Sequence, residues 1–232
     1  MEKGKLYIVA TPIGNLGDIT YRAVEILKSV TFVLAEDTRE SIKLFRKYEI
    51  NTKLVSYRDQ NHDKMIEKIR EKLNMGLNLA LVSDSGTPLI SDPGFKLVRE
   101  LRKFGYLVES IPGPSALISA LSISGLPTDK FVFLGFLPKS DKKRKEMLKK
   151  YFDLENTVIL YESPKRVLSL LQLIDDCSKE NTVVLAKDLT KFREEVLSGQ
   201  SIELISLLKD RDFENNPHGE FVVLIYPCLK KE

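Results

Sequence analysis

The sequence predicts an α/β protein made of two α/β domains, and three observations favour this fold class. Short runs rich in β-branched residues alternate with amphipathic helical patterns, which is typical of βαβ units and a mostly parallel sheet. The 232 residues exceed the commonest domain size of roughly 100 to 150 residues. A Pro-Gly-Pro segment at residues 112–114 cannot continue a helix or a strand. We therefore expect domains at residues 1–113 and 114–232.

The first domain is predicted to contain four strands separated by helices. The strands are expected at residues 6–10, 32–35, 77–82 and 107–111. Between the second and third of them, residues 62–74 carry apolar side chains at helical spacing among charged ones. One stripe of this helix should pack on the sheet while the rest faces water.

The second domain should begin with a helix from about Ser115, rich in Ala, Leu and Ser. Four strands are then expected, at residues 130–134, 157–161, 182–186 and 221–225. Ser163 followed by Pro164 is typical of an N-cap and a first-turn proline, and predicts a helix running to about Asp176.

Composition excludes several classes of protein. With 43% hydrophobic and 30% charged residues the chain is globular rather than disordered. Its longest apolar run, residues 131–137, is far shorter than the roughly 20 residues of a membrane helix, and its start lacks a signal-peptide pattern, so a cytoplasmic protein is expected. Two distant cysteines, Cys177 and Cys228, and two isolated histidines argue against a disulfide framework or a metal site.

The net charge of +3 is small, but positive charge is concentrated in residues 139–150. Seven basic residues stand there against two acidic ones, a local net charge of +5 that leaves the rest of the chain at −2. Such a stretch is often only the solvated face of a helix. Its imbalance beside an aromatic run at residues 131–136 favours contact with phosphates. The residues expected to bind RNA are Lys139, Lys142, Lys143, Arg144, Lys145 and Arg166.

Turns follow three of the expected strands, at residues 11–18, 36–39 and 83–94; the first and third are rich in Gly and Pro, and the second is charged. Ligands of open α/β sheets bind at the carboxyl ends of strands. Any one of these turns could merely reverse the chain, whereas three at one edge favour a binding site. The first turn has only Gly14 and Gly17, with Pro12 where a phosphate-binding amide would be needed. A nicotinamide-dependent oxidoreductase is therefore disfavoured, and the chain has no P-loop sequence.

Five segments in order resemble the tetrapyrrole-methylase superfamily, and within it the branch that methylates a cytidine ribose of 16S ribosomal RNA. The segments are VATPIGNLGD (9–18), AEDTR (35–39), DSGTPLISDPG (84–94), IPGPSA (111–116) and YESPKR (161–166). Small-molecule members tend to have a glycine-richer first loop and Gly-Asp-Pro at residues 86–88. This chain has Thr87 in place of that aspartate, and in this it resembles the ribosomal branch.

The resemblance implies an S-adenosylmethionine-dependent 2′-O-methyltransferase acting in the decoding region of 16S ribosomal RNA. It also implies two α/β domains with a cofactor cleft between them, a homodimer, and the small ribosomal subunit as partner. The residues expected by position to bind the cofactor are Pro12, Asp84, Ser85, Gly86, Thr87, Pro88 and Ile90 on one side, and Ser115, Ala116 and Tyr161 on the other.

A ribose hydroxyl is a weak nucleophile near neutral pH, so a base or a nearby cation should assist methyl transfer. Candidates follow expected strands or begin helices: Asp37, Arg39, Lys165, Arg166, Lys187 and Asp188. Each could instead be an exposed charge, with Thr38 and Ser163 simply capping helices. The Asp37-Thr38-Arg39 turn favours function, because paired charges at a helix start can orient a phosphate-bearing substrate.

Two alternatives stay open at this point. A methylase of the same fold could act on a corrin-type ring or on a modified protein side chain, although the basic stretch speaks against it. A non-catalytic RNA-binding module would leave the elaborate turns unexplained.

Overall fold

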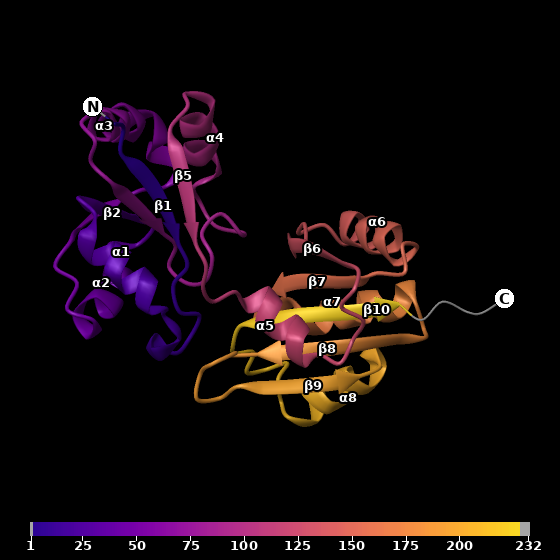
Figure 1. Ribbon diagram of the computed structural model, residues 1–232. Helices are drawn as coiled ribbons and strands as arrows, with labels where there is room; N and C mark the ends of the chain where they lie inside the picture. Colours follow the sequence, from indigo (N-terminus) through magenta and orange to yellow (C-terminus); the bar gives the residue numbers. More distant parts are fainter. Residues whose placement is uncertain (1, 228–232) are drawn as a thin grey trace. The chain divides into compact units, whose positions relative to one another are not determined.

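Residues 2–227 are described by a computed structural model, in which the chain divides into two units between Ser115 and Ala116 (Figure 1). The boundary expected from the sequence, after residue 113, falls just before this division. Each unit has its own sheet and its own hydrophobic core.

The first unit contains a five-stranded sheet in the order β3-β2-β4-β1-β5, and all of its strands are parallel. Its strands are β1 (Lys5–Val9), β2 (Phe32–Ala35), β3 (Lys53–Ser56), β4 (Leu79–Val82) and β5 (Leu107–Ile111). Its helices are α1 (Tyr21–Ser29), α2 (Thr38–Lys47), α3 (His62–Asn74) and α4 (Phe95–Lys103), with 3-10 turns η1 (Leu16–Asp18) and η2 (Asp59–Asn61). The expected parallel sheet and the helix at 62–74 are confirmed.

Helices cover both faces of this parallel sheet. Side chains from α1 and α2 pack with Tyr7 and Val9 of β1, whereas side chains from α3 and α4 pack with Leu6 on the opposite face. The central strand β4 is therefore buried along its whole length. This burial explains why β4 is a continuous apolar run rather than an alternating one.

The second unit contains a mixed sheet in the order β6-β7-β10-β8-β9. Its elements are α5 (Ala116–Ile123), β6 (Phe131–Phe136), α6 (Asp141–Phe152), β7 (Thr157–Glu162), α7 (Pro164–Cys177), β8 (Asn181–Lys187), β9 (Glu195–Gly199), α8 (Ser201–Asp210) and β10 (Phe221–Pro227). Within this unit α5 lies in front of the sheet in Figure 1, and α7 lies behind it. The main core joins α6, α7 and α8 to the sheet.

Strand direction gathers several loops at one edge of the second sheet. Strand β6 is parallel to β7, and β10 is antiparallel to both β7 and β8. The carboxyl ends of β6, β7 and β8 therefore lie at the same edge, beside the start of β10. In the first unit all five strands end at one edge for the same reason.

Two strands, β3 and β9, were not predicted from the sequence. Both are edge strands, and their side chains are exposed or half-buried along their whole length. Each holds only two apolar residues, too few to signal a strand.

None of the helices between residues 2 and 227 is long and apolar enough to cross a membrane. In the same part of the chain no three His, Cys, Asp or Glu side chains are grouped as a metal ion would require. Cys177 is half-buried, and Cys228 lies outside the described residues.

Candidate functional site

The loops that follow β1 and β4 are joined backbone to backbone. The N–H of Thr11 donates to the carbonyl of Gly86 at 2.8 Å, and the N–H of Gly86 donates back at 3.0 Å. Gly86 has a φ of 76°, a conformation that favours glycine. The expected cofactor residues between Pro12 and Pro88 thus come from two loops that hold each other in place.

The Pro-Gly-Pro segment closes against these two loops. The hydroxyl of Thr87 donates to the carbonyl of Pro114 at 3.1 Å. A side chain at Gly113 would place its Cβ 3.0 Å from the Cβ of Ala10, tighter than almost all real contacts. Glycine is needed there because the segment passes so close to the first loop. Beyond Thr87, Ile90 leaves part of its apolar side chain exposed.

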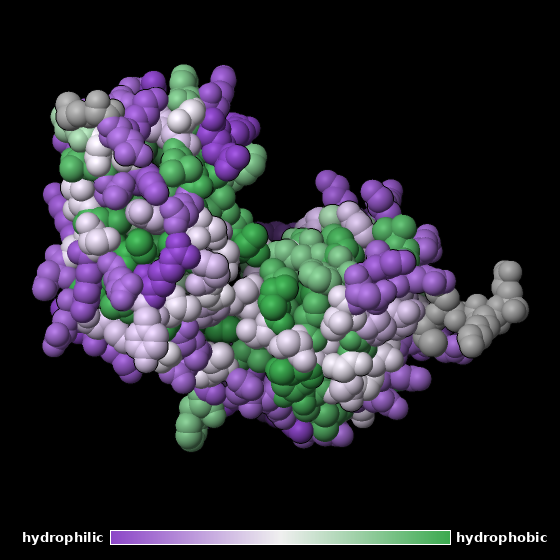
Figure 2. Space-filling view, in the orientation of Figure 1, coloured by the Kyte–Doolittle hydropathy of each residue, from purple (hydrophilic) through white to green (hydrophobic). Residues whose placement is uncertain are grey.

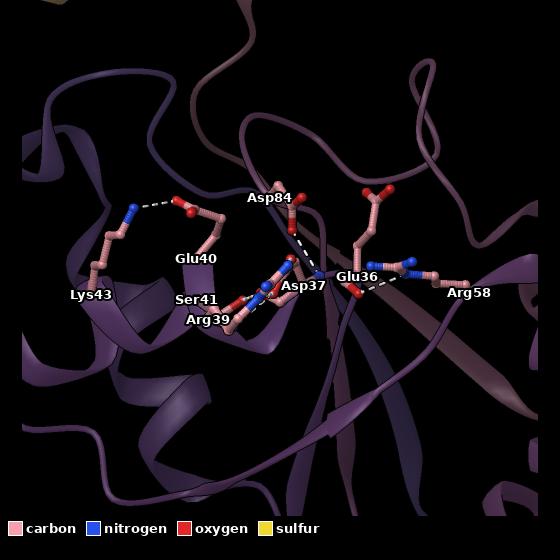
Figure 3. Close-up of polar contacts among 8 residues, drawn as sticks. All are labelled: Glu36, Asp37, Arg39, Glu40, Ser41, Lys43, Arg58 and Asp84. Carbon is pink, nitrogen blue, oxygen red and sulfur yellow. Dashed lines mark hydrogen bonds and ion pairs between the residues drawn. The ribbon is translucent and has the colours of Figure 1, made fainter.

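The end of β2 brings the catalytic candidates Asp37 and Arg39 next to Asp84 (Figure 3). Asp84 accepts a hydrogen bond from the backbone N–H of Asp37 at 2.8 Å. The carboxylate of Asp37 accepts from the backbone N–H of Arg39 at 2.9 Å and pairs with its guanidinium at 2.5 Å. Asp37 is therefore the N-cap of α2, and the suggestion that Thr38 caps this helix is wrong.

The ionisation of Asp37 is set by its neighbour. Hydrogen bonds from the side chain and then the backbone of Arg39 hold the pKa of Asp37 well below its usual range. The side chain of Arg39 is itself 85% exposed. A charge that is exposed on one side and anchored on the other is suited to binding an anionic group.

Two further carboxylates lie close to Asp84 in the first unit. The pKa of Asp92 is raised to about 6, chiefly by burial; a hydrogen bond from Ser83 opposes the shift, and the charge of Asp84 adds to it. Burial also raises the pKa of Glu36, with the charges of Asp84 and Asp92 adding to it. Arg58 donates to the carbonyl of Glu36 at 3.2 Å (Figure 3). This edge of the sheet is acidic and favours a cation.

In the second unit, candidates gather where β7 and β8 end. Phe221 of β10 is paired with Glu162 on one side and with Lys187 on the other. Lys187 is only 8% exposed, and its amine lies 3.8 Å from the carboxylate of Asp188. Lys165 is exposed in the first turn of α7, after Ser163, which occupies the N-cap position without a side-chain cap bond. Of the cofactor candidates near this unit, Ser115 and Ala116 are half-buried, and the ring of Tyr161 packs against two phenylalanines.

Arg166 is hydrogen-bonded to the loop that precedes the basic stretch. Its guanidinium donates to the carbonyls of Leu137 and Pro138 at 3.0 and 3.2 Å and lies 3.3 Å from the buried carboxylate of Glu162. These bonds tie the loop before α6 to the end of β7. Arg166 therefore supports the basic helix in addition to any contact it makes with a ligand.

Arg144, which was expected to bind RNA, is buried in this structure. Arg144 is only 3% exposed, pairs with Asp141 at 2.9 Å and lies 3.4 Å from the hydroxyl of Ser169. It shares the inward face of α6 with Leu148, one turn further along, so its guanidinium points at α7 rather than at solvent. Charge counting along the sequence could not separate this inward face from the outward one.

The lysines of the basic stretch have the opposite placement. Most of them are exposed: Lys139, Lys142, Lys143, Lys149 and Lys150. Lys145 is half-buried, 4.0 Å from Asp176. Figure 2 shows hydrophilic residues gathered over α6 and hydrophobic ones over α5 and β6.

Sequence reasoning missed two acidic residues that shape these sites. Asp92 lies in the Gly- and Pro-rich turn after β4, and Glu162 ends the apolar strand β7. An ionisable residue at the end of a buried strand is the signal that could have found Glu162.

The chain is similar to known proteins over almost its whole length. Residues 5–204 match the profile of the family described as Tetrapyrrole (Corrin/Porphyrin) Methylases. The ribosomal RNA small subunit methyltransferase I of Vibrio cholerae is 47% identical over 222 residues, which are 95% of this chain and 76% of the relative. The protein of the same name from Thermotoga maritima is 43% identical over 96% of this chain and 98% of its own.

The fold is also similar to a solved structure. That of a cobalamin biosynthetic enzyme, cobalt precorrin-4 methyltransferase, has a TM-score of 0.67 at 16% identity and covers 96% of this chain and 94% of its own. At that identity the likeness concerns the fold alone.

Proposed function

The chain belongs to the tetrapyrrole methylase family, and from this we propose that it uses S-adenosylmethionine to methylate the 2′-hydroxyl of a cytidine ribose in the decoding region of 16S ribosomal RNA. The observation that carries the proposal is identity of 43% or more, over nearly the full chain, to proteins named as small-subunit ribosomal RNA methyltransferases. The exposed lysines of α6 support an RNA substrate independently.

The first unit suits S-adenosylmethionine as the methyl donor. When bound, this cofactor would supply an activated methyl group on a positively charged sulfur. The carboxylates of Glu36, Asp84 and Asp92 provide the negative charge that such a cation favours. The joined loops at Thr11, Gly86 and Thr87 offer backbone groups and short side chains for the uncharged parts of the molecule. We propose that Ser85, Pro88 and Ile90 on the same loop, with Pro12, Ser115, Ala116 and Tyr161, complete the contacts.

The chain must orient the ribose and favour loss of its hydroxyl proton as the oxygen attacks. Asp37 is a weak base because its carboxylate is stabilised by Arg39. We therefore propose that Asp37 fixes Arg39 and that Arg39 holds a phosphate of the substrate. In the second unit, the amines of Lys165 and Lys187 are candidates to stabilise the developing oxyanion.

We further propose a homodimer that acts in the cytoplasm, where small ribosomal subunits are found. Exposed hydrophobic side chains on α5 and β6 support self-association, among them Ile118, Ile123, Phe131 and Phe136.

A labelling experiment tests the proposed reaction. The protein would be incubated with methyl-labelled S-adenosylmethionine and small ribosomal subunits that lack their native methylations. We expect label in 16S RNA, on a ribose. Subunits that already carry the modification are the control and should take up little label. Label that appears only in protein, or none at all, would contradict the proposal.

A further inference from the structure

The loop that joins β8 to β9, residues 188–194, is tightly hydrogen-bonded within itself. The N–H of Lys191 donates to the carbonyl of Asp188 at 2.9 Å, and that of Glu194 donates to the carbonyl of Lys191 at 3.1 Å. The N–H of Thr190 donates to the carboxylate of Glu194 at 2.5 Å. These hydrogen bonds give the loop a defined backbone conformation.

The base of the loop is fastened to the segment that precedes β10. Asp188 and Glu220 exchange two hydrogen bonds, and the amine of Lys191 lies 2.8 Å from the carboxylate of Glu220. Asp188 and Thr190 have φ values of 51° and 64°; aspartate tolerates this left-handed region, but it is unfavourable for a β-branched residue such as Thr190. A non-glycine residue keeps such a backbone only when its surroundings hold it there.

This held loop presents one aromatic side chain to solvent. Phe192 is 103% exposed, more than any other large hydrophobic residue between residues 2 and 227. Its neighbour Arg193 is also exposed, and among these described residues it takes part in no ion pair. Lys191, by contrast, is engaged by Asp188 and Glu220.

The place of the loop in the second unit links it to the candidate RNA contacts. It follows β8, whose carboxyl end lies at the same edge as the ends of β6 and β7. Lys139, Lys165 and Lys187 come from that edge. The exposed lysines of this edge are Lys139 and Lys165, since Lys187 is buried beside Asp188. An aromatic face next to a free cation is the combination that binds unpaired nucleotides by stacking and phosphate contact.

We propose that Phe192 stacks on an unpaired base of the RNA substrate and that Arg193 contacts a neighbouring phosphate. This inference rests on the proposed function and adds a binding site to it. A second copy of the chain is a poorer occupant, because Phe192 is the one apolar side chain from residue 190 to residue 194 and forms no continuous apolar patch there.

Steady-state methylation of undermethylated small subunits by the full-length protein tests the inference. Phe192→Ala should raise KM for subunits by roughly tenfold or more while leaving KM for S-adenosylmethionine unchanged. Phe192→Trp should behave like the wild type, because it keeps an aromatic face. Phe192→Leu, which keeps apolar area without a ring, should be as defective as Phe192→Ala. Tyr21→Ala is the matched control, since Tyr21 is 93% exposed on the first unit and should be silent.

The salt dependence of subunit binding separates the two contacts. Arg193→Gln should reduce the slope of log affinity against log salt by about 0.7, and Phe192→Ala should leave the slope unchanged. The inference would be overturned if either Phe192→Ala or Phe192→Leu had the KM of the wild type. It would also be overturned if these variants lost the mass of a dimer without a change in KM. Absence of methylation by the wild-type protein would instead contradict the proposed function, and this inference with it.

Discussion

Arg39 is the single residue whose surroundings most clearly point to substrate contact. Its guanidinium is fixed by Asp37 on one side and exposed on the other. Arg39→Ala should therefore lower kcat/KM for small subunits by roughly tenfold to a hundredfold, the effect of losing a charge-assisted hydrogen bond. Binding of S-adenosylmethionine, measured by calorimetry, should be unchanged.

The helix that carries Arg39 supplies a matched control. Lys43 is also exposed on α2, and it pairs with Glu40 at 2.6 Å. Lys43→Ala should retain full activity, whereas Lys165→Ala in the second unit should resemble Arg39→Ala. Full activity in both Arg39→Ala and Lys165→Ala would remove these residues from the reaction.

Asp92 predicts a pH-dependent stability for the protein without ligand. Its pKa is about 6 when folded, above the ordinary value of 3.8, so the folded state favours the protonated acid. The resulting destabilisation is absent below pH 4 and complete once the pH has risen through 6. Asp92→Asn should therefore raise the free energy of unfolding at pH 8 by about 2 kcal/mol, allowing for partial exposure, and change little at pH 4.

Urea unfolding at the two pH values measures this difference. Asp84→Asn serves as a second variant, because it removes the neighbouring charge and should lower the pKa of Asp92. An Asp92→Asn variant with the same stability as the wild type at pH 8 would show that burial does not destabilise this carboxylate.

At the scale of elements, the basic side chains of α6 divide between one buried position and several exposed ones. Arg144 is buried against α7, and Lys143 beside it in sequence is exposed. Arg144→Ala should lower the free energy of unfolding by about 1–3 kcal/mol, because it removes a buried side chain that packs between α6 and α7 and leaves a cavity there. Lys143→Ala should leave stability unchanged but flatten the salt dependence of RNA binding.

Thermal unfolding and filter binding on the same two variants make this comparison. A stable Arg144→Ala variant that loses RNA affinity would restore Arg144 as an RNA contact and reverse the assignment of the two faces.

The elements also show how far the sequence could predict the fold. β2 and β5 have the bounds expected from their apolar runs, and α3 has those expected from its helical periodicity. The edge strands β3 and β9 were missed because each holds only two apolar residues, whereas the edge strands β5 and β6 hold more and were predicted. Strand order and direction in the second sheet depend on contacts distant in sequence, which no local pattern encodes.

The candidate site, like the fold, could be predicted from the sequence only in part. Loop motifs placed Gly86 and Thr87 at one edge of the first sheet, and the structure joins them to Thr11 and Pro114. The burial of Arg144 could not be predicted, because a charge run in the sequence does not say which charges face inward.

At the scale of the whole molecule, the proposed cofactor residues are divided between two units. Asp84 to Ile90 belong to the first unit and Tyr161 to the second. If both groups contact one cofactor molecule, S-adenosylhomocysteine should slow hydrogen exchange in residues 84–90 and also in residues 161–163. The unliganded protein is the baseline, and adenosine alone, which lacks the amino-acid part, is the control ligand. At a hundredfold excess over Kd, binding should also stabilise the protein by about 2.7 kcal/mol. Protection limited to residues 84–90 would confine the cofactor to the first unit and exclude Tyr161 from its site.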